Sequence, residues 1–461
     1  MRPRDSRRIQ AIALGVALLS AARVARADTE EGSYYSDDAA IMAGAVTSWT
    51  RDAGAVWYNP AGLGGETRAQ LTLNGSLYAL KIREIPNALS THFPGTTRSI
   101  DLESSDIMSA PHATAMVFRL SDNVALGLGI YISERDVRTA QNTLEFTALR
   151  GSGVAFDANL RQHIDAASEV TKYNAGPAIG WEIARHLRVG ANTFITYTRT
   201  SSLALFEVDI TGISGTPPPT VFALNNQHVN ATEFGLVGAL GVQWDPTPEW
   251  HLGATLRAPE VRLSQSIGGS AIGASSAVVS GVAPSAQLSF VHAREGNGVG
   301  LKVPFRALLS AAHVVSDRVM ISMEGDILPA IDDSATRVKT RTVVNARLGL
   351  RASLSERLVA GVGFFSDRDR QVLGNSLTDE RIDRYGVTAG LQFLAPFTLE
   401  TDDGPAPNGL ILGTTIALRY AMGLGEVRAL DYDSVTGRSF ARAVDVMYHE
   451  WTPYIGSAVS F

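Results

Sequence analysis

Residue types that commonly carry catalysis or bind metals are sparse in this sequence. Its 461 residues include no cysteine, which excludes disulfide frameworks and cysteine-ligated zinc or iron–sulfur sites. The nine histidines form no H-x-x-x-H or H-E-x-x-H pair, so no metal site is predicted. His313 and Ser310 are three residues apart in a segment with strand periodicity, so they face opposite sides and make a poor catalytic pair. We expect neither an enzyme nor a bound cofactor.

Two G-x-G patterns, at 127–129 and 361–363, invite comparison with nucleotide-binding loops. Both lie inside strand-like segments and neither opens a helix, so a nucleotide site is rejected. Glycine inside a strand can instead mark a bend or leave room for a close neighbour. Gly127 and Gly129 are therefore candidates for a strand kink, with close packing as the alternative.

The motif Asn59-Pro60-Ala61-Gly62 has the clearest local chemistry. Pro60 fixes its own φ near −65° and keeps Asn59 out of the helical region. The Asn59 side chain can bond to nearby backbone, and Gly62 tolerates a positive φ. We expect a compact, self-bonded turn that fits an enclosed space without unpaired backbone groups. A plain loop leading into the first strand is the alternative.

Composition places the chain among folded proteins, since 45% of its residues are hydrophobic and 19% are charged. Four arginines among the first eight residues, an apolar stretch over 9–22 and an A-x-A site at 25–27 predict a secretory signal peptide over 1–27. A membrane anchor is disfavoured because the apolar run is shorter than the ~20 residues that a spanning helix needs. Six arginines and one aspartate leave with the signal peptide, so the net charge falls from −6 to −11. That charge gives no electrostatic footprint for nucleic acid.

The rest of the chain has the period of two that is typical of strands. In 234–244, we assign the Phe, Leu, Gly, Leu, Val, Trp face to lipid and the Gly, Val, Ala, Gly, Gln face to an enclosed lumen. In 358–365 the lumen face reads Val, Gly, Gly, Phe. A small, weakly charged lumen face suits apolar ligands or a packed plug. Fourteen strands are predicted near 69–82, 112–120, 124–134, 173–183, 187–201, 233–244, 250–258, 303–315, 319–327, 342–353, 357–367, 384–395, 410–422 and 446–461.

Short and long connections alternate along the chain, which is typical of outer-membrane barrels. Short polar turns recur near 121–123, 184–186, 245–249, 316–318 and 354–356. Long polar loops are predicted near 83–111, 135–172, 202–232, 259–302, 328–341, 368–383 and 423–445. The segment 286–294 also alternates. We assign it to a long outer loop to keep the strand count even, and a membrane strand is the alternative.

Aromatic residues favour a membrane barrel. Trp181, Trp244 and Trp250 lie beside predicted turns, where a membrane–water interface suits them. The chain ends on an alternating strand at Phe461, which resembles the recognition signal of the barrel-assembly machinery. Fourteen strands enclose more space than their own side chains fill. We therefore expect residues 28–68 to plug a barrel formed by residues 69–461.

The segment around the Asn-Pro-Ala-Gly turn resembles the N-terminal region of the FadL-like family, the outer-membrane transporters of long-chain fatty acids and hydrocarbons. The match runs through Asp52 and the run 57–63, and the segments 120–133 and 244–259 look like hairpins of that family. The resemblance implies an all-β transmembrane barrel of about 14 strands with a small N-terminal hatch inside its lumen. The residues of the hatch that would gate the channel are Asn59, Pro60, Ala61 and Gly62.

The resemblance also implies a function. We expect an outer-membrane channel that takes up long-chain fatty acids or hydrocarbons passively, holds the ligand in the lumen and releases it sideways after hatch movement. The lateral exit would lie at a kink in the third strand, here at Gly127 and Gly129. Its partners would be a hydrophobic small molecule, outer-membrane lipid and lipopolysaccharide, and the barrel-assembly machinery acting on Phe461. The alternative is a barrel of the same family that acts as a scaffold or shuttle for secreted surface proteins.

Overall fold

The structure is a computed structural model of the chain. It describes residues 34–66, 68–93, 96–148, 157–213, 220–278, 285–297, 299–334, 338–374, 380–397, 400–401, 404–405, 410–433 and 438–461. The predicted signal peptide over 1–27 lies outside the described residues. Within them, no helix has the length and apolar character needed to cross a membrane.

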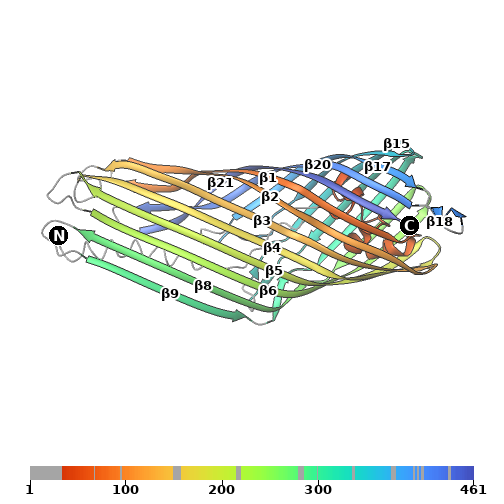
Figure 1. Cartoon of the computed structure of the whole chain (residues 1–461), viewed down its shortest axis with the longest axis horizontal. Coiled ribbons are helices and arrows are strands. Elements are labelled where there is room, and N and C mark those ends of the chain that lie inside the picture. Colours follow the sequence, from red (N-terminus) through yellow and green to blue (C-terminus); the bar gives the residue numbers. More distant parts are fainter. Residues whose placement is uncertain are drawn as a thin grey trace.

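A closed, elongated barrel of fourteen antiparallel strands forms the molecule, as predicted (Figure 1). Strand β1 pairs with β21 from Gln70↔Ser460 onward, and this pairing closes the wall. The wall strands are β1 (Gln70–Phe93), β2 (Thr96–Ser121), β3 (Val124–Ala148), β4 (Ala158–Ala184), β5 (Leu187–Gly212), β6 (Thr220–Thr247), β7 (Trp250–Arg257), β8 (Glu260–Val278), β9 (Ser285–Asn297), β10 (Gly300–Val303), β11 (Arg306–Ser316), β12 (Val319–Leu328), β15 (Val343–Ser355), β16 (Leu358–Asp367), β17 (Glu380–Phe397), β20 (Leu410–Asp433) and β21 (Arg438–Ser460). Two small hairpins lie outside the wall, β13 (Asp332–Asp333) with β14 (Val338–Lys339) and β18 (Glu400–Thr401) with β19 (Gly404–Pro405).

Two of the fourteen strands are interrupted. Both β7 and β8 pair with β6, so together they form one long strand broken at Ala258 and Pro259. Both β9 and β10 pair with β8, and β11 pairs with β7, so these three pieces form the next strand. The assignment of 286–294 to a loop was therefore wrong. This segment is the outer part of a wall strand, and it leaves the strand count at fourteen.

Most of the predicted long loops are strands instead. Their described residues pair into hairpins that extend the wall far beyond the end with the short turns, which we call the lower end of the barrel (Figure 1). These hairpins lie in the segments 83–111, 135–172, 202–232, 259–302 and 423–445. The segments 328–341 and 368–383 contain most of the remaining loop residues. The loops were predicted because polar residues occupy both faces there, which removes the alternation. Pairing between neighbouring backbones forms the strands regardless of that alternation.

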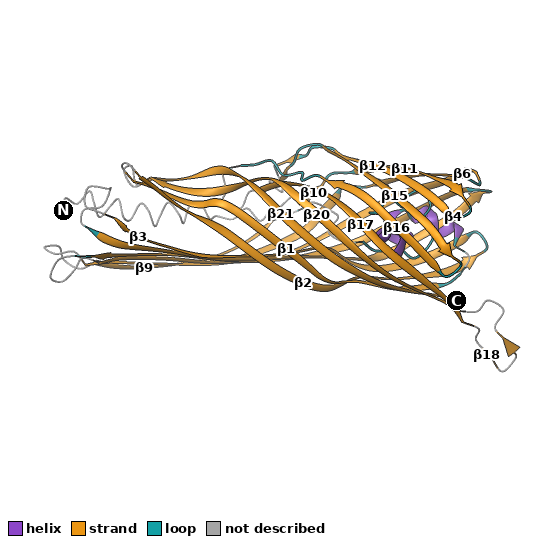
Figure 2. Ribbon diagram, turned by 90° about the horizontal axis from the view of Figure 1, so that it is seen from above, coloured by secondary structure: helices purple, strands orange, loops and turns teal. Residues whose placement is uncertain are grey.

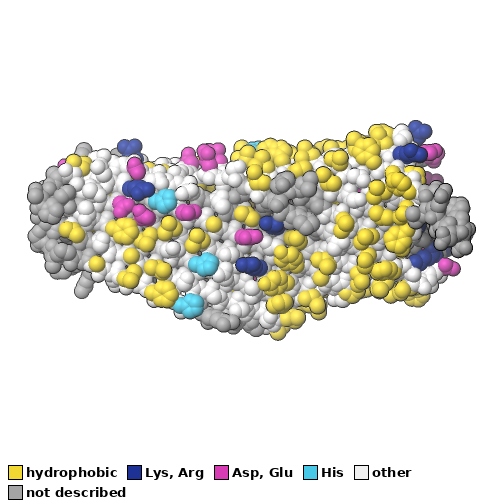
Figure 3. All heavy atoms as spheres, in the orientation of Figure 1, with side chains coloured by type: hydrophobic (Ala, Val, Ile, Leu, Met, Phe, Trp, Pro, Cys, Tyr) yellow, Lys and Arg dark blue, Asp and Glu magenta, His cyan; other side chains and the backbone are white. Residues whose placement is uncertain are grey.

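An apolar band covers the lower part of the wall, at the end with the short turns (Figure 3). Trp181, Trp244 and Trp250 are exposed at the turns, as expected for a membrane–water interface. Tyr197 lies 4.9 Å from Phe234 between ring centroids and marks the other rim of the band. We call the wall above this rim the outer extension. In β4 it comprises residues 158–172, or roughly 50 Å of strand at ~3.3 Å per residue.

The predicted faces of the wall are confirmed. In β6, Leu240 is 63% exposed, whereas Gln243 is fully buried. In β16, Val359 and Phe365 point into the barrel and Phe364 points outward. Alternation therefore identified the lipid side correctly, because the two sides of a membrane strand meet different solvents.

Residues 34–66 lie inside the lower barrel, and we call them the inner segment (Figure 2). It contains α2 (Asp37–Ile41), α3 (Ala55–Tyr58) and the 3₁₀ helix η1 (Pro60–Gly65). Its side chains are almost all buried and form the centre of the main hydrophobic cluster. The helix α2 begins at Ser36, whose hydroxyl accepts a hydrogen bond from the Ala39 N–H at 3.2 Å.

Glycines of the wall let the inner segment approach the strand backbones. A Cβ atom at Gly190 would lie 2.3 Å from the Pro60 carbonyl carbon, which is too close for any side chain. At Gly363 it would meet the backbone of Met42 at 2.6 Å. The small lumen face therefore accommodates a packed plug, which is one of the two outcomes expected from the sequence.

We predict that Gly190→Val displaces the inner segment. Overpacking at a backbone contact typically costs about 1–3 kcal/mol, so the thermal unfolding midpoint should fall and the inner segment should become accessible to protease. The matched control is Gly268→Val in β8, where an added Cβ has no atom within 4 Å. Equal midpoints for the two variants would contradict the packing described here.

Candidate functional site

The Asn-Pro-Ala-Gly turn is buried and fully bonded. The Asn59 side chain accepts a hydrogen bond from the Ala61 N–H at 3.2 Å. Its amide donates to the Thr47 carbonyl at 2.8 Å and to the Val242 carbonyl of β6 at 3.0 Å. Asn59 therefore closes its own turn, as predicted, and also ties that turn to the wall. Gly62 is required locally, since a Cβ there would lie 1.9 Å from the Thr50 carbonyl oxygen.

Polar side chains of the wall form hydrogen bonds with the residues of the inner segment that precede this turn. We call these hydrogen bonds the polar grip. Gln243 donates to the carbonyls of Thr47 and Thr50 at 3.1 and 2.9 Å. On the opposite side, the Glu324 carboxylate accepts from the Thr47 N–H at 3.1 Å. Because these groups are buried, separating them leaves polar atoms without partners, which is costly. The turn that was predicted to gate the channel thus lies in the most firmly held part of the inner segment.

A cluster of charges joins the inner segment to the short-turn end of the wall. The Asp245 carboxylate accepts from Arg51 of the inner segment at 2.7 Å and from His251 of β7 at 2.7 Å. It also pairs with Arg188 of β5. We call these four residues the lower latch. It ties one residue of the inner segment to three neighbouring wall strands.

The opposite end of the inner segment is aromatic. The Trp57 ring lies 4.8 Å from Tyr35 and 4.9 Å from Tyr131 of β3, measured between ring centroids. Phe194 of β5 completes the group at 5.5 Å from Trp57. We call these four residues the aromatic cluster. The contacts within it are mostly apolar, in contrast to the polar grip on Thr47 and Asn59.

The pairing between wall strands changes beside the aromatic cluster. Strands β2 and β3 are paired from Ser121↔Val124 to Ala113↔Tyr131, and within the described residues their ladder goes no further. Above this point β2 stays paired with β1, and β3 stays paired with β4. We call the end of this ladder the β2–β3 break. It begins near the upper rim of the apolar band, since Ile132 pairs with Tyr173 of β4.

A bulge in β3 coincides with the β2–β3 break. The register between β3 and β4 shifts between Ile132 and Glu134. The hydroxyl of Tyr35 in the inner segment donates to the Ile132 carbonyl at 3.3 Å. The inner segment therefore contacts the wall at the bulge itself.

Gly127 and Gly129 lie below the bulge. A Cβ at Gly127 would meet Val56 of the inner segment at 2.4 Å, so this glycine admits a close neighbour. At Gly129 it would meet the Tyr131 ring at 2.4 Å, so this glycine lets that ring fold back along the strand. The register shift in β3 thus falls four positions beyond Gly129, and the kink expected at these glycines stays a prediction.

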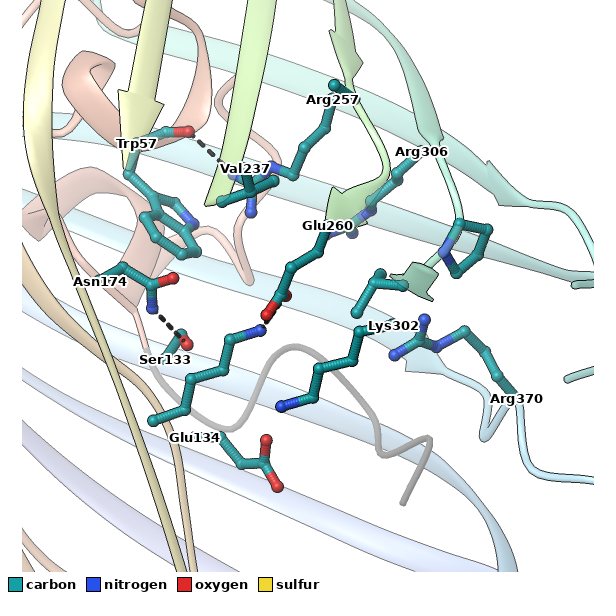
Figure 4. Close-up of a pocket in the computed structure, with 14 residues that line it drawn as sticks. Trp57, Ser133, Glu134, Asn174, Val237, Arg257, Glu260, Lys302, Arg306 and Arg370 are labelled. Carbon is teal, nitrogen blue, oxygen red and sulfur yellow. Dashed lines mark hydrogen bonds and ion pairs between the residues drawn. The ribbon is translucent and has the colours of Figure 1, made fainter. Parts of the chain in front are cut away.

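A charged pocket lies directly above the aromatic cluster (Figure 4). Trp57 forms part of its floor, and Ser133 and Asn174 line one side. Its charged lining comprises five cations, Lys172, Arg257, Lys302, Arg306 and Arg370, and two carboxylates, Glu134 and Glu260. This lining differs from the apolar lumen expected from the sequence.

Ion pairs organise part of this pocket. Lys302 donates to Glu233 at 2.6 Å, and Lys172 pairs with Glu260. Arg306 pairs with Asp326, which lies behind the lining. Among the residues that line the pocket, cations outnumber carboxylates by five to two. This composition is suited to an anionic group.

No sequence motif marks the residues of the pocket, because they come from strands far apart in the chain. The only available signal is a single charge on the inward side of an alternating strand, as at Lys172 and Glu233. Such isolated charges become a site only when the barrel closes and brings their strands together.

One apolar cluster lies inside the outer extension above the pocket. Leu89 of β1 and Ile100 of β2 are buried against Leu144, Ile164 and Phe206 of β3, β4 and β5. Buried polar side chains, such as Gln162 and Asp431, also lie in these strands. The lumen thus passes from an upper part of mixed character through a charged pocket to an aromatic floor.

We predict that the lower latch keeps the barrel closed to ions. Arg51→Gln removes the tie to the inner segment, while Asp245 keeps Arg188 and His251, so the wall should still fold. The ion conductance of the variant in planar bilayers should rise above that of the parent protein. Arg185→Gln, in the exposed turn before β5, is the matched control. Equal conductance in all three proteins would count against the latch.

The stability with which the inner segment packs inside the barrel, which we call its seating, should depend on pH through Asp37. Burial raises the pKa of Asp37 from 3.8 to about 6, and the neighbouring Asp38 adds to the effect. The Asp37 carboxyl therefore binds its proton more tightly when the inner segment is packed inside the barrel than when the segment is released from it. Seating is strongest below about pH 4 and weakens by on the order of 1–3 kcal/mol as pH rises through 6.

The test compares thermal midpoints of the parent protein and Asp37→Asn at pH 4 and pH 7.5. Asparagine can still accept the hydrogen bond that Tyr454 donates at 3.1 Å. The variant should gain stability relative to the parent as pH rises. A difference between the two midpoints that does not change with pH would refute the role of Asp37.

Comparison with known proteins gives the same architecture. No family model matches the sequence, and no curated protein matches it. Among solved structures, a FadL homologue of Pseudomonas aeruginosa is similar at 14% identity and a TM-score of 0.54, with 94% of this chain and 99% of that chain covered. The toluene transporter TodX of P. putida is similar at 15% identity and a TM-score of 0.52, with coverages of 93% and 98%. The toluene transporter TbuX of Ralstonia pickettii gives 14%, 0.52, 93% and 98% for the same quantities.

These structures are transport channels rather than enzymes, and they match this chain over nearly its whole length. The closed barrel, its apolar band and its aromatic rims place the protein in an outer membrane, as predicted from the sequence. The chain therefore has the FadL-like barrel fold.

Proposed function

We propose that this protein is a passive outer-membrane channel for anionic amphiphiles of the long-chain fatty acid type. The observation that carries the proposal is a pocket lined by five cations and two carboxylates, directly above a floor of aromatic rings. A carboxylate would pair with the cations, and an acyl chain would pack against the rings. The toluene transporters of the same fold are named for a neutral hydrocarbon, which carries no charge that could pair with these cations.

The outer extension would deliver the ligand. Its apolar cluster around Leu89, Leu144 and Phe206 offers an acyl chain a route past the polar outer surface. Burial of apolar surface gives about 25 cal/mol per Å², so even a partly covered chain is held there. The ligand would then descend until its carboxylate reaches the cations of the pocket.

The β2–β3 break would serve as the lateral exit. It adjoins the aromatic cluster and begins near the upper rim of the apolar band. An acyl chain that leaves there enters the outer leaflet without crossing the polar grip on Thr47. The exit would therefore lie at the Ile132 bulge rather than at Gly127 or Gly129.

The movable part of the hatch would be its aromatic end. Tyr35 and Trp57 separate the pocket from the β2–β3 break, and their rings pack against each other and against Tyr131. The turn formed by Asn59, Pro60, Ala61 and Gly62 would act in gating as the fixed end, because its polar groups are bonded to the wall.

Uptake of labelled palmitoleate by cells that lack the gene tests the proposal. Cells that produce the protein should take up palmitoleate faster than cells that do not, with no dependence on ATP. Toluene uptake measured in parallel should rise much less. Equal palmitoleate uptake with and without the protein would exclude this function.

Stapling the β2–β3 break tests the exit. The chain has no cysteine, so paired cysteines can be introduced without competing thiols. The Asn142 amide contacts the Asp101 carbonyl farther out along β2 and β3, so a disulfide between Asp101→Cys and Asn142→Cys would tie the two strands together above the break. Oxidation should slow palmitoleate uptake several-fold, and a reductant should restore it.

The matched control for the staple is Thr114→Cys with Ile130→Cys, a pair that already faces each other in the β2–β3 ladder. A disulfide at that position should leave uptake unchanged. If the upper disulfide also leaves uptake unchanged, the ligand does not leave through the β2–β3 break.

A further inference from the structure

Strand β9 forms a free edge of the outer extension (Figure 1). It pairs with β8 along one side, and within the described residues no strand pairs with its other side. The next wall strand, β12, ends at Leu328, one residue beyond the pair Ala307↔Ile327, so it does not reach β9. The backbone N–H and C=O groups of β9 that point away from β8 are therefore open to another extended chain.

The residues along this edge are exposed and carry no Lys, Arg, Asp or Glu. All seven side chains from 286 to 292 are exposed, in the order Ala, Gln, Leu, Ser, Phe, Val and His. Leu288, Phe290 and Val291 are 75, 65 and 59% exposed. Proteins commonly protect a free edge with lysine, proline or a bulge. These seven residues include neither residue type, and their ladder with β8 has no register shift.

Apolar side chains beside the edge enlarge the exposed surface. Ile272 of β8 lies directly opposite Phe290, and it is exposed, as is Leu203 of β5. Ile272 also pairs with Asn226 of β6, which lies eight residues further out along that strand than Phe234 at the rim of the apolar band. These side chains therefore face water rather than lipid. An apolar patch exposed to water is typical of a site of protein contact.

We propose that the free edge of β9 is a docking site for an extended segment of another polypeptide, which adds to the outer extension as a further strand beside residues 286–292. The unpaired backbone determines the class of occupant, because an extended peptide presents N–H and C=O groups at the spacing of a strand. Lipids and sugars do not repeat donors and acceptors at that spacing. The site lies outside the lumen, so it is independent of the channel function proposed above.

The direction of β9 argues against a second copy of this chain as the occupant. Copies in one membrane all stand the same way up, so two β9 strands that met edge to edge would run parallel. Parallel pairs are slightly less stable per residue than antiparallel pairs, and the ladder between β8 and β9 is antiparallel. A separate polypeptide can approach in either direction and can therefore continue the antiparallel sheet.

The edge also defines the chemistry of the docked segment. Side chains directly opposite Leu288 and Phe290 would share their outward face, where apolar or β-branched residues pack best. The alternate side chains would point to the other face, next to Val291. We therefore expect a segment of about seven residues with strand alternation and without proline, which cannot donate to a ladder.

Binding of a defined peptide tests the site. The probe is a fluorescein-labelled peptide of five Thr-Val repeats, with lysine at one end and glutamate at the other. The control peptide has proline in place of the central valine. Each peptide is added to the full-length protein in detergent micelles. Fluorescence anisotropy should show saturable binding of the alternating peptide, and the proline peptide should bind about tenfold more weakly or not at all.

A charge placed on the edge should block it. Phe290→Lys puts a lysine where natural edges often carry one, and the Phe290 side chain is mostly exposed, so the fold should be kept. The affinity for the alternating peptide should fall about tenfold. Leu203→Lys is the matched control, because it changes an exposed leucine of β5, a strand that is paired on both sides. Its affinity should equal that of the parent protein.

Hydrogen exchange locates the bound peptide. The amides of residues 286–292 that point away from β8 should exchange fast in the protein alone and slowly when the peptide is bound. Failure of the alternating peptide to bind, equal affinity in Phe290→Lys and the parent, or protection confined to other residues would overturn the proposal. Self-association without peptide that Phe290→Lys abolishes would also overturn it, because the occupant would then be a second copy.

Discussion

The packing of this barrel depends on one constraint, which is that its wide lumen has to be filled. Fourteen strands cannot close on their own side chains, and the space is filled by a segment whose backbone must also find partners. The contact of Pro60 with Gly190 shows how this is met, because bare strand backbone meets bare turn backbone. Asn59 then supplies the hydrogen bonds that such close packing requires. Glycines such as Gly190, Gly241 and Gly363 are thus explained by a residue of the inner segment rather than by their own strands.

The charged side chains that face the lumen above the inner segment are subject to a different constraint. Carboxylates and cations that face a lumen must be paired or hydrated, and the strands bring partners such as Lys302 and Glu233 together across the barrel. The pairing is unequal at the pocket, where cations outnumber carboxylates. In the proposed function, this lining would disfavour apolar molecules and favour an anion.

Much of the barrel could be predicted because each strand carries local information. Alternation identified the lower strands and their faces, as in β6 between Leu240 and Gln243. The turn at Asn59 was predictable because its chemistry involves only adjacent residues. The outer extension was missed, since its strands expose polar groups on both faces and differ from loops only through pairing with distant strands. The pocket was missed for a related reason, because Lys172 and Lys302 meet only after closure.

The inner segment combines two kinds of attachment, and in the proposed mechanism this difference determines which part moves. Around Thr47 and Asn59, buried hydrogen bonds hold the chain, and breaking any of them leaves an unsatisfied group in a dry environment. Around Trp57, ring packing joins hydrogen bonds from Asn192 to the Val56 carbonyl and from Thr255 to the Tyr58 carbonyl. Apolar contacts have no required direction, so rings can exchange one neighbour for another, including an acyl chain. In the proposed mechanism the ligand replaces ring contacts at the aromatic end, while the hydrogen bonds of the backbone keep the barrel closed beneath it.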